Sequence, residues 1–205
     1  SDGRPRVAVV GGNEGAGTSR VLRELGNAAA EEDATVYAVT CAAQGRAVPF
    51  SGLSRLVRTH TDATSVAEMR LLLGTLSDAV EPMLRADGVG TGDVAPPDAM
   101  GIAEAVALLV DALASTRPLV LVFDNAHELD SETLRVLRYI AGDAALPTRV
   151  DDCAFGVVIV FGIPGAELAA GTELGDLFEA MQKLGCARHV PLGMLDDAQL
   201  QAMAL

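Results

Sequence analysis

The amino-acid sequence predicts an α/β fold with three layers, in which helices cover both faces of a five-stranded, mainly parallel sheet. Short runs of aliphatic residues alternate with longer stretches of helical periodicity, which is typical of βαβ units. Residues 119–123 are apolar at every position, as expected for a central parallel strand that is buried on both faces. Half of the 205 residues are hydrophobic, which is enough for one sizeable core and favours a single domain over residues 1–205.

The first half of the chain begins with two predicted strands, followed by a long helical region. The strands lie at residues 7–10 and 36–41, with a helix at 19–31 between them. Apolar residues recur at helical spacing in three further segments, at residues 52–60, 66–86 and 99–116. Residues 87–98 are rich in Gly, Asp and Pro and predict a flexible loop.

The second half continues the alternation of strands and helices. Three strands are expected, at residues 119–123, 157–161 and 189–192. Helices are expected between them, at residues 131–144 and 174–184. Because residues 196–205 begin another helical pattern, we expect the chain to be part of a longer protein.

The charge balance argues against direct contact with nucleic acid. The net charge is −13 and the sequence pI is about 4.5, which creates a negative field that repels phosphate backbones. Of the 15 basic residues only Lys183 is a lysine. Together with the abundance of Ala, Gly and Val, this preference for arginine indicates a GC-rich bacterial genome.

Cysteine usage and hydropathy predict a cytoplasmic protein that does not bind a membrane. Cys41, Cys153 and Cys186 are widely spaced and form no CxxC pair, so we expect reduced core thiols rather than disulfides or a zinc site. No apolar run approaches the roughly 20 residues that cross a bilayer. The first six residues lack the apolar stretch of a signal peptide.

A glycine-rich loop follows the first predicted strand and precedes the first helix. Its residues 12–19 match the spacing of the P-loop pattern G-x-x-x-x-G-K-[ST]. Glycines there let successive backbone N–H groups converge on a phosphate, and the positive end of the helix adds to the attraction. The candidate nucleotide-binding residues are Gly12, Asn13, Glu14, Gly15, Ala16, Gly17, Thr18, Ser19 and Arg20. A glycine turn that merely joins a strand to a helix is the structural alternative.

The loop departs from the P-loop pattern at one position. Thr18 stands where the lysine that reaches the β- and γ-phosphates belongs. Arg20 is the nearest cation, but each helical residue turns by about 100°, so its side chain should point away from the phosphates. Ser19 keeps the hydroxyl that binds Mg²⁺ in such loops. The sequence therefore leaves nucleotide binding open and argues against efficient hydrolysis.

An acidic residue ends the central apolar strand. Asp124 lies where P-loop proteins hold Mg²⁺, so Ser19 and Asp124 are the candidate metal ligands and Asp124 is the candidate catalytic residue. The next residue in such proteins is often a second acid that polarises water, and here it is Asn125. Glu128 and Asp130 follow, and Asp130 fits the N-cap of the next helix.

The three histidines do not define a further site. His127 is a candidate general base, but no nucleophile motif such as G-x-S-x-G accompanies it. His60 and His189 are isolated, and no H-E-x-x-H spacing occurs, so we expect packing or surface roles. A dinucleotide-binding oxidoreductase is a weaker alternative, because residues 12–15 give no convincing G-x-G-x-x-G register and no acid ends the second strand.

Together these segments resemble the nucleotide-binding module of the STAND branch of AAA+-like ATPases, found in large bacterial transcription regulators of the LuxR, SARP and MalT type. Residues 12–22 are similar to that family's G-E-x-G-[IA]-G-K-S-R-L-L. Residues 48–56 are similar to V-P-F-x-x-L-x-x-L, and residues 118–130 to P-L-V-L-V-x-D-D-x-H-W-x-D. The chain departs from the family at Thr18, at Asn125 and at Ile163, where an arginine that senses the γ-phosphate is common.

The resemblance implies a P-loop NTPase core that binds ATP or ADP with Mg²⁺ as a regulatory switch, with little or no hydrolysis. It also implies that a helical lid and effector domains of the parent protein lie outside residues 1–205. The expected partners are these other domains, or a second copy of the chain in a homo-oligomer. A different class of function stays open, in which a pseudo-ATPase keeps the fold as a protein-interaction module and binds no nucleotide.

Overall fold

The computed structural model describes residues 6–46, 48–61, 74, 99–143, 156–165, 168 and 171–194. The strands in this part of the chain are β1 (Arg6–Gly12), β2 (Thr35–Thr40), β3 (Leu119–Asp124), β4 (Val157–Pro164) and β5 (Ala187–Leu192). The α-helices are α1 (Thr18–Glu31), α2 (Ser51–Thr61), α5 (Ala99–Ala114), α6 (Ser131–Arg138) and α7 (Glu173–Lys183). Three short helical turns complete the description, η1 (Ala43–Gly45), η3 (Ala126–Glu128) and η4 (Tyr139–Asp143).

The five strands form one sheet in the order β2-β3-β4-β1-β5. Every neighbouring pair runs parallel, and β3 pairs with β2 on one side and with β4 on the other. Five of its six residues are buried, as the apolar run at 119–123 predicts. The predicted five-stranded parallel sheet is therefore confirmed.

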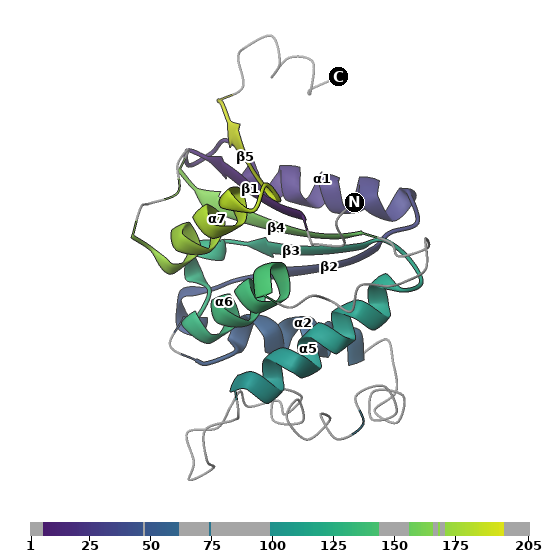
Figure 1. Ribbon diagram of the computed structural model, residues 1–205. Helices are drawn as coiled ribbons and strands as arrows, with labels where there is room; N and C mark the ends of the chain where they lie inside the picture. The colour runs from purple at the N-terminus through teal and green to yellow at the C-terminus, as the bar shows by residue number, and fades with distance from the viewer. Residues whose placement is uncertain are drawn as a thin grey trace.

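Helices cover both faces of this sheet, which gives the three layers that the sequence predicts (Figure 1). Helix α1 packs on one face, where its Leu22 contacts a small apolar cluster with Val10, Val122 and Val160. Helices α2, α5, α6 and α7 lie on the opposite face and share one large core with the sheet. Phe123 and Phe161 stack in that core with their ring centroids 5.7 Å apart.

The chain leaves the adjacent strands β1 and β4 in opposite directions. After β1 it crosses to β2 through α1 on one face, and after β4 it crosses to β5 through α7 on the other. In open parallel sheets a crevice forms between the carboxyl ends of two strands whose connections diverge in this way, and ligands bind there. The glycine loop after β1 and the end of β3 lie at this edge of the sheet.

The bounds of several predicted elements differ from the structure. The first strand was expected to end at residue 10, but β1 continues to Gly12, and β5 begins at Ala187 rather than at residue 189. The fourth strand was expected to end at residue 161, but β4 continues to Pro164 because Gly162 and Ile163 pair with Val10 and Gly11 of β1. The helix expected over residues 131–144 ends at Arg138 and continues as the π-helical turn η4. Within that turn Gly142 makes room for a methionine, since a Cβ there would lie 2.9 Å from Cε of Met181.

The structure describes two of the three cysteines and part of the remaining predicted segments. Cys41 and Cys186 are buried and form no disulfide, whereas Cys153 lies outside the described part. The helix at 66–86, the loop at 87–98 and the final helix at 196–205 also fall outside it. In the part that is described, no helix is long and apolar enough to cross a membrane.

Candidate functional site

The glycine loop between β1 and α1 takes a backbone conformation that requires glycine at two positions. Gly15 has a φ of 85° and Gly17 a φ of 86°, in the left-handed region that other residues rarely adopt. The N–H of Ala16 donates to the carbonyl oxygen of Asn13 at 2.9 Å and closes a tight turn. A Cβ on Gly12 would lie 2.8 Å from the Cβ of Ala16, so the loop also folds back closely on the end of β1. The predicted P-loop spacing thus coincides with real conformational demands.

The N-terminus of α1 is open, in the sense that no side chain caps it, whereas α6 and α7 each have a side-chain cap. Its cap residue Gly17 offers no side-chain hydrogen bond, and the first turn contains no acid. In α6 and α7 the side chains of Asp130 and Thr172 cap the first turn, and acids lie within it. The first N–H groups of a helix lack partners inside the helix, so the start of α1 attracts an anion.

The candidate residues of the first turn of α1 differ in exposure. Ser19 and Arg20 are exposed, whereas Thr18 is half-buried. Of the preceding loop, Asn13 and Glu14 are exposed. Whether Arg20 turns away from a bound phosphate stays a prediction.

Thr18 and Asp124 both lie close to Gly162 of the sheet. Gly162 was not among the candidate residues predicted from the sequence. A Cβ on Gly162 would lie 3.1 Å from Oδ1 of Asp124 and 3.4 Å from Cγ2 of Thr18, and it would also collide with Leu22. Gly162 lies in β4, between the strands that carry the loop and the acid. Because Gly162 has no side chain, Leu22, Thr18 and Asp124 can all pack close to its backbone.

The residue after Asp124 has a conformational role of its own. Asn125 has a φ of 54° and a ψ of 44°, and asparagine enters this left-handed region more readily than most residues. Its N–H donates to Oδ1 of Asp124 at 2.9 Å, which orients the carboxylate. Ile163, at the position where the resemblance places an arginine, is buried in β4 and carries no charge. No cation replaces the loop lysine at either of these two positions.

The turn η3 carries a small polar cluster around Glu128. Nε2 of His127 lies 3.2 Å from Oε1 of Glu128, and Nε of Arg46 lies 3.8 Å from Oε2 of the same carboxylate. Arg46 also donates to the carbonyl oxygen of His127. Nδ1 of His127 is buried without a hydrogen-bond partner. Among the described residues no group of three or more His, Cys, Asp or Glu side chains could hold a metal ion.

The remaining histidines give no second centre in the described residues. His189 lies on β5, half-buried, with its ring edge against Phe178 at a centroid distance of 6.2 Å. Its Nε2 is buried without a partner, near Gly11. The packing role expected for His189 therefore agrees with its surroundings, while the side chain of His60 lies outside the described part.

Asp130 caps α6 as predicted, and it also reaches a segment far away in the sequence. Its Oδ1 accepts from the N–H of Thr133 at 2.8 Å, which is the expected cap. The same oxygen accepts from the N–H of Phe50 at 2.8 Å, and Oδ2 accepts from the N–H of Gly52 at 3.3 Å. One carboxylate thus caps both α2 and α6.

Burial and neighbouring carboxylates suppress the reactivity of a thiol close to this edge. Burial raises the pKa of Cys41 to about 12; Arg55 opposes that shift, and the negative charges of Asp124, Asp130 and Glu128 add to it. The backbone N–H of Cys41 donates to the carbonyl oxygen of Asp124 at 2.9 Å, which places the thiol next to the acidic strand end. A neutral thiol is neither a nucleophile nor a metal ligand.

Comparison with known families agrees with this geometry. The sequence profile of the AAA ATPase domain matches residues 1–159, most of the chain. The chain belongs to the AAA ATPase domain family. This AAA domain is therefore of the nucleotide-binding type. None of the curated proteins compared with it matches.

Among solved structures, the AAA domain is similar to the ORC2 protein of Aeropyrum pernix, described as ADPNP-ADP complexes. The two share 15% sequence identity with a TM-score of 0.49. The match covers 99% of this chain and 45% of that one, so the chain spans less than half the length of that protein.

Proposed function

We propose that this AAA domain binds ATP or ADP at residues 12–19 as a regulatory switch, with little or no hydrolysis. The observation that carries the proposal is the open N-terminus of α1, which follows the left-handed Gly15 and Gly17; Thr18, its first residue, and Asp124 both lie beside Gly162. Phosphate groups are the ligands that such a nest of N–H groups attracts. Ser19 and Asp124 would hold the Mg²⁺ that accompanies the nucleotide.

Weak hydrolysis follows from what surrounds the phosphates. Thr18 places a methyl group toward Gly162 where the family's lysine would bring a cation, and Ile163 is a buried aliphatic side chain. Asn125 cannot accept a proton from water. Removal of one oriented charge-stabilising group typically lowers turnover by about 10²–10³. Binding without turnover still suffices for a switch, which needs only two conformations with different affinity for the nucleotide.

The wider role follows from the resemblance of residues 12–22, 48–56 and 118–130 to STAND modules. We infer a cytoplasmic, multidomain bacterial transcription regulator in which the nucleotide changes contacts between this domain and its neighbours or a second copy. The net charge of −13 supports DNA contact through another domain.

A protein-interaction module that binds no nucleotide is the second candidate. Thr18, Asn125 and Ile163 favour it, because three polar functions of the family are replaced together. The two candidates differ in one measurable property, which is affinity for nucleotide.

Calorimetry with Mg-ATP and Mg-ADP distinguishes them. We expect saturable heat for the wild-type chain and a 10- to 100-fold gain in affinity for Thr18→Lys, since one charge-assisted hydrogen bond contributes about 1.5–3 kcal/mol. Thr116→Lys is the matched control, because Thr116 is exposed beyond the end of α5 and the substitution adds the same charge. Absence of heat in both the wild type and Thr18→Lys would support the interaction module and overturn the switch.

A further inference from the structure

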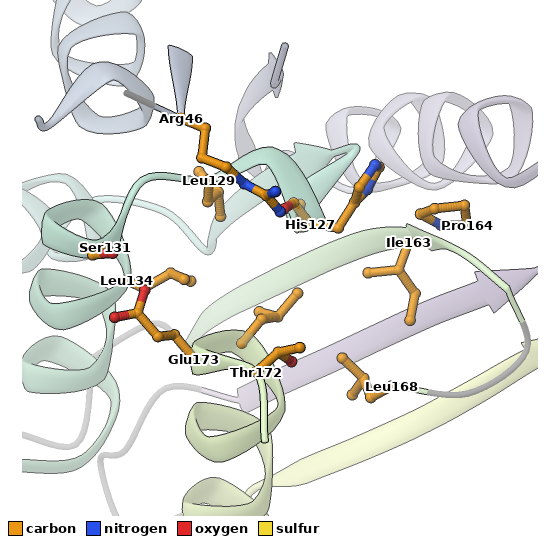
Figure 2. A pocket seen from close by; sticks show the side chains of 12 residues that line it. Arg46, His127, Leu129, Ser131, Leu134, Ile163, Pro164, Leu168, Thr172 and Glu173 are labelled. Carbon is orange, nitrogen blue, oxygen red and sulfur yellow. The ribbon is translucent and has the colours of Figure 1, made fainter. Parts of the chain in front are cut away.

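A pocket separate from the glycine loop opens at the carboxyl edge of the sheet, on the face covered by α6 and α7 (Figure 2). Its volume is about 350 Å³. Pockets for small molecules range from about 300 to 1,000 Å³, so this one suits a small ligand. No residue of the glycine loop lines it.

The apolar walls of the pocket are aliphatic. Leu129 and Leu134 approach it from the side of α6, and Ile163 and Leu174 from β4 and α7. All four side chains are buried in the fold. Walls of this kind favour a ligand that buries an aliphatic body of its own.

Two polar side chains at the starts of α6 and α7 also line the pocket. Ser131 is the first residue of α6 and Glu173 the first residue of α7, and both are exposed. In the part of the chain that the structure describes, neither side chain forms a hydrogen bond or an ion pair. Figure 2 shows the carboxylate of Glu173 beside Leu134, on the same side of the pocket as Ser131. A hydroxyl and a carboxylate are therefore available to a ligand whose aliphatic body lies in the pocket.

The charges around these two groups favour a ligand with a positive charge. Glu173 and the exposed Asp176 place two carboxylates in the first turn of α7, which offset the positive end of that helix. Arg46 lines the pocket from the side of η3, but its guanidinium already lies 3.8 Å from Glu128 and donates to the carbonyl oxygen of His127. The whole chain carries a net charge of −13. An ammonium group matches a carboxylate and a hydroxyl, because it donates hydrogen bonds and accepts none.

We propose that this pocket binds a small primary aliphatic amine in its ammonium form. The ammonium group donates to the carboxylate of Glu173 and to the hydroxyl of Ser131, and the aliphatic chain enters the space among Leu134, Ile163 and Leu174. All polar contacts lie at one end of the ligand, so the flexible chain needs no second polar partner across the pocket. This proposal goes beyond the nucleotide switch and does not depend on it, because no glycine-loop residue takes part.

Methyl NMR on the full chain without nucleotide tests the proposal. The probes are 4-methylpentylamine, 4-methylpentanol and 4-methylpentanoate, which share one carbon skeleton and carry a positive, no and a negative charge at neutral pH. We expect the amine to shift the methyl signals of Leu134, Ile163 and Leu174 saturably and to bind about fivefold more tightly than the alcohol, the effect of one exposed ion pair. The carboxylate should bind more weakly than the alcohol, because Glu173 repels it.

Three outcomes on the wild-type chain overturn the proposal. The first is equal binding of the amine and the alcohol, and the second is tightest binding of the carboxylate. The third is the absence of a saturable shift with the amine at about 20 mM, close to the weakest useful affinity.

Removal of one carboxylate assigns the ammonium contact. Glu173→Gln should abolish the preference for the amine over the alcohol and leave the affinity for the alcohol within about twofold. Asp176→Asn is the matched control, because it removes the same charge from the same turn of α7 at an exposed residue that does not line the pocket. An equal loss of preference in the control would mean that the amine responds to the general negative charge of the chain, and the proposal would be wrong. The comparison of the three probes on the wild type needs no variant to fold.

Discussion

One carboxylate, that of Asp130, holds the starts of two helices, and its replacement by alanine measures what that contact contributes. The side chain is 2% exposed. Besides the three backbone N–H groups described above, it accepts from the hydroxyls of Ser51 at 3.1 Å and Thr133 at 2.7 Å. These backbone N–H groups belong to Phe50, Gly52 and Thr133, and all three residues are buried. Alanine therefore leaves three buried backbone donors without an acceptor.

The size of the effect follows from these orphaned groups. A buried donor without a partner costs about 1–3 kcal/mol, and water that enters the vacated space keeps the three losses from adding fully. We expect Asp130→Ala to lower the free energy of unfolding by about 4 kcal/mol, a large share of the ~5–15 kcal/mol of a typical domain. Asp130→Asn should cost about 2 kcal/mol, because it keeps one carbonyl oxygen and both hydroxyls can rotate to accept from its amide.

Urea unfolding followed by circular dichroism gives the free energy of unfolding of each variant. The comparison holds provided that the slope of this free energy against urea concentration is the same for wild type and variants. Asp176→Asn is the control, since this exposed acid in the first turn of α7 should change stability by less than about 0.5 kcal/mol. An alanine variant within about 1 kcal/mol of the wild type would refute the shared cap. Equal losses for alanine and asparagine would refute the assignment of the acceptors.

Two further predictions concern the glycine loop and the buried thiol. Gly17→Ala should destabilise the fold by about 1–2 kcal/mol, because alanine at a φ of 86° is strained even though no atom lies within 4 Å of its Cβ. Gly26 lies inside α1, where a Cβ would make only ordinary contact with Val36, so Gly26→Ala should instead stabilise the fold by about 0.5–1 kcal/mol. If thermal unfolding shows that both variants change the stability in the same direction, this reasoning is contradicted. The raised pKa keeps Cys41 protonated at pH 8, so iodoacetamide should label it only after unfolding; rapid labelling of the folded chain, detected by mass spectrometry, would show that the thiol is accessible and ionised.

The sequence predicted the central strands well because β3 and β4 begin as short apolar runs, and β3 in particular has no polar residue before Asp124. It misplaced the end of β4, because the order Gly162, Ile163, Pro164 is typical of a turn. Only the pairing of these residues with β1 shows that the strand continues. The helix predicted over residues 131–144 is helical as far as Asp143, but from Tyr139 it takes the π-helical form of η4, which helical periodicity in the sequence did not indicate.

The candidate site was predictable where its chemistry is local. The spacing of residues 12–19 indicated the loop, and the left-handed Gly15 and Gly17 agree with it. The role of Gly162 was not predictable, because it depends on β4 lying between β1 and β3, and spacing along the chain does not reveal strand order. Its signal in the sequence is only a glycine near the end of an apolar strand.

The two other segments that resemble the STAND family support the architecture of the fold rather than the binding of nucleotide. Residues 48–56 and 118–130 are far apart in the sequence. Asp130 nevertheless joins them, because its carboxylate accepts hydrogen bonds from the N–H groups of Phe50 and Gly52. A shared helix cap is sufficient reason for both segments to occur together in one fold. Their joint presence therefore supports the architecture and says little about nucleotide. The argument for nucleotide binding rests on the glycine loop, the open start of α1 and Asp124, and calorimetry on Thr18→Lys addresses those features while leaving the Asp130 cap untouched.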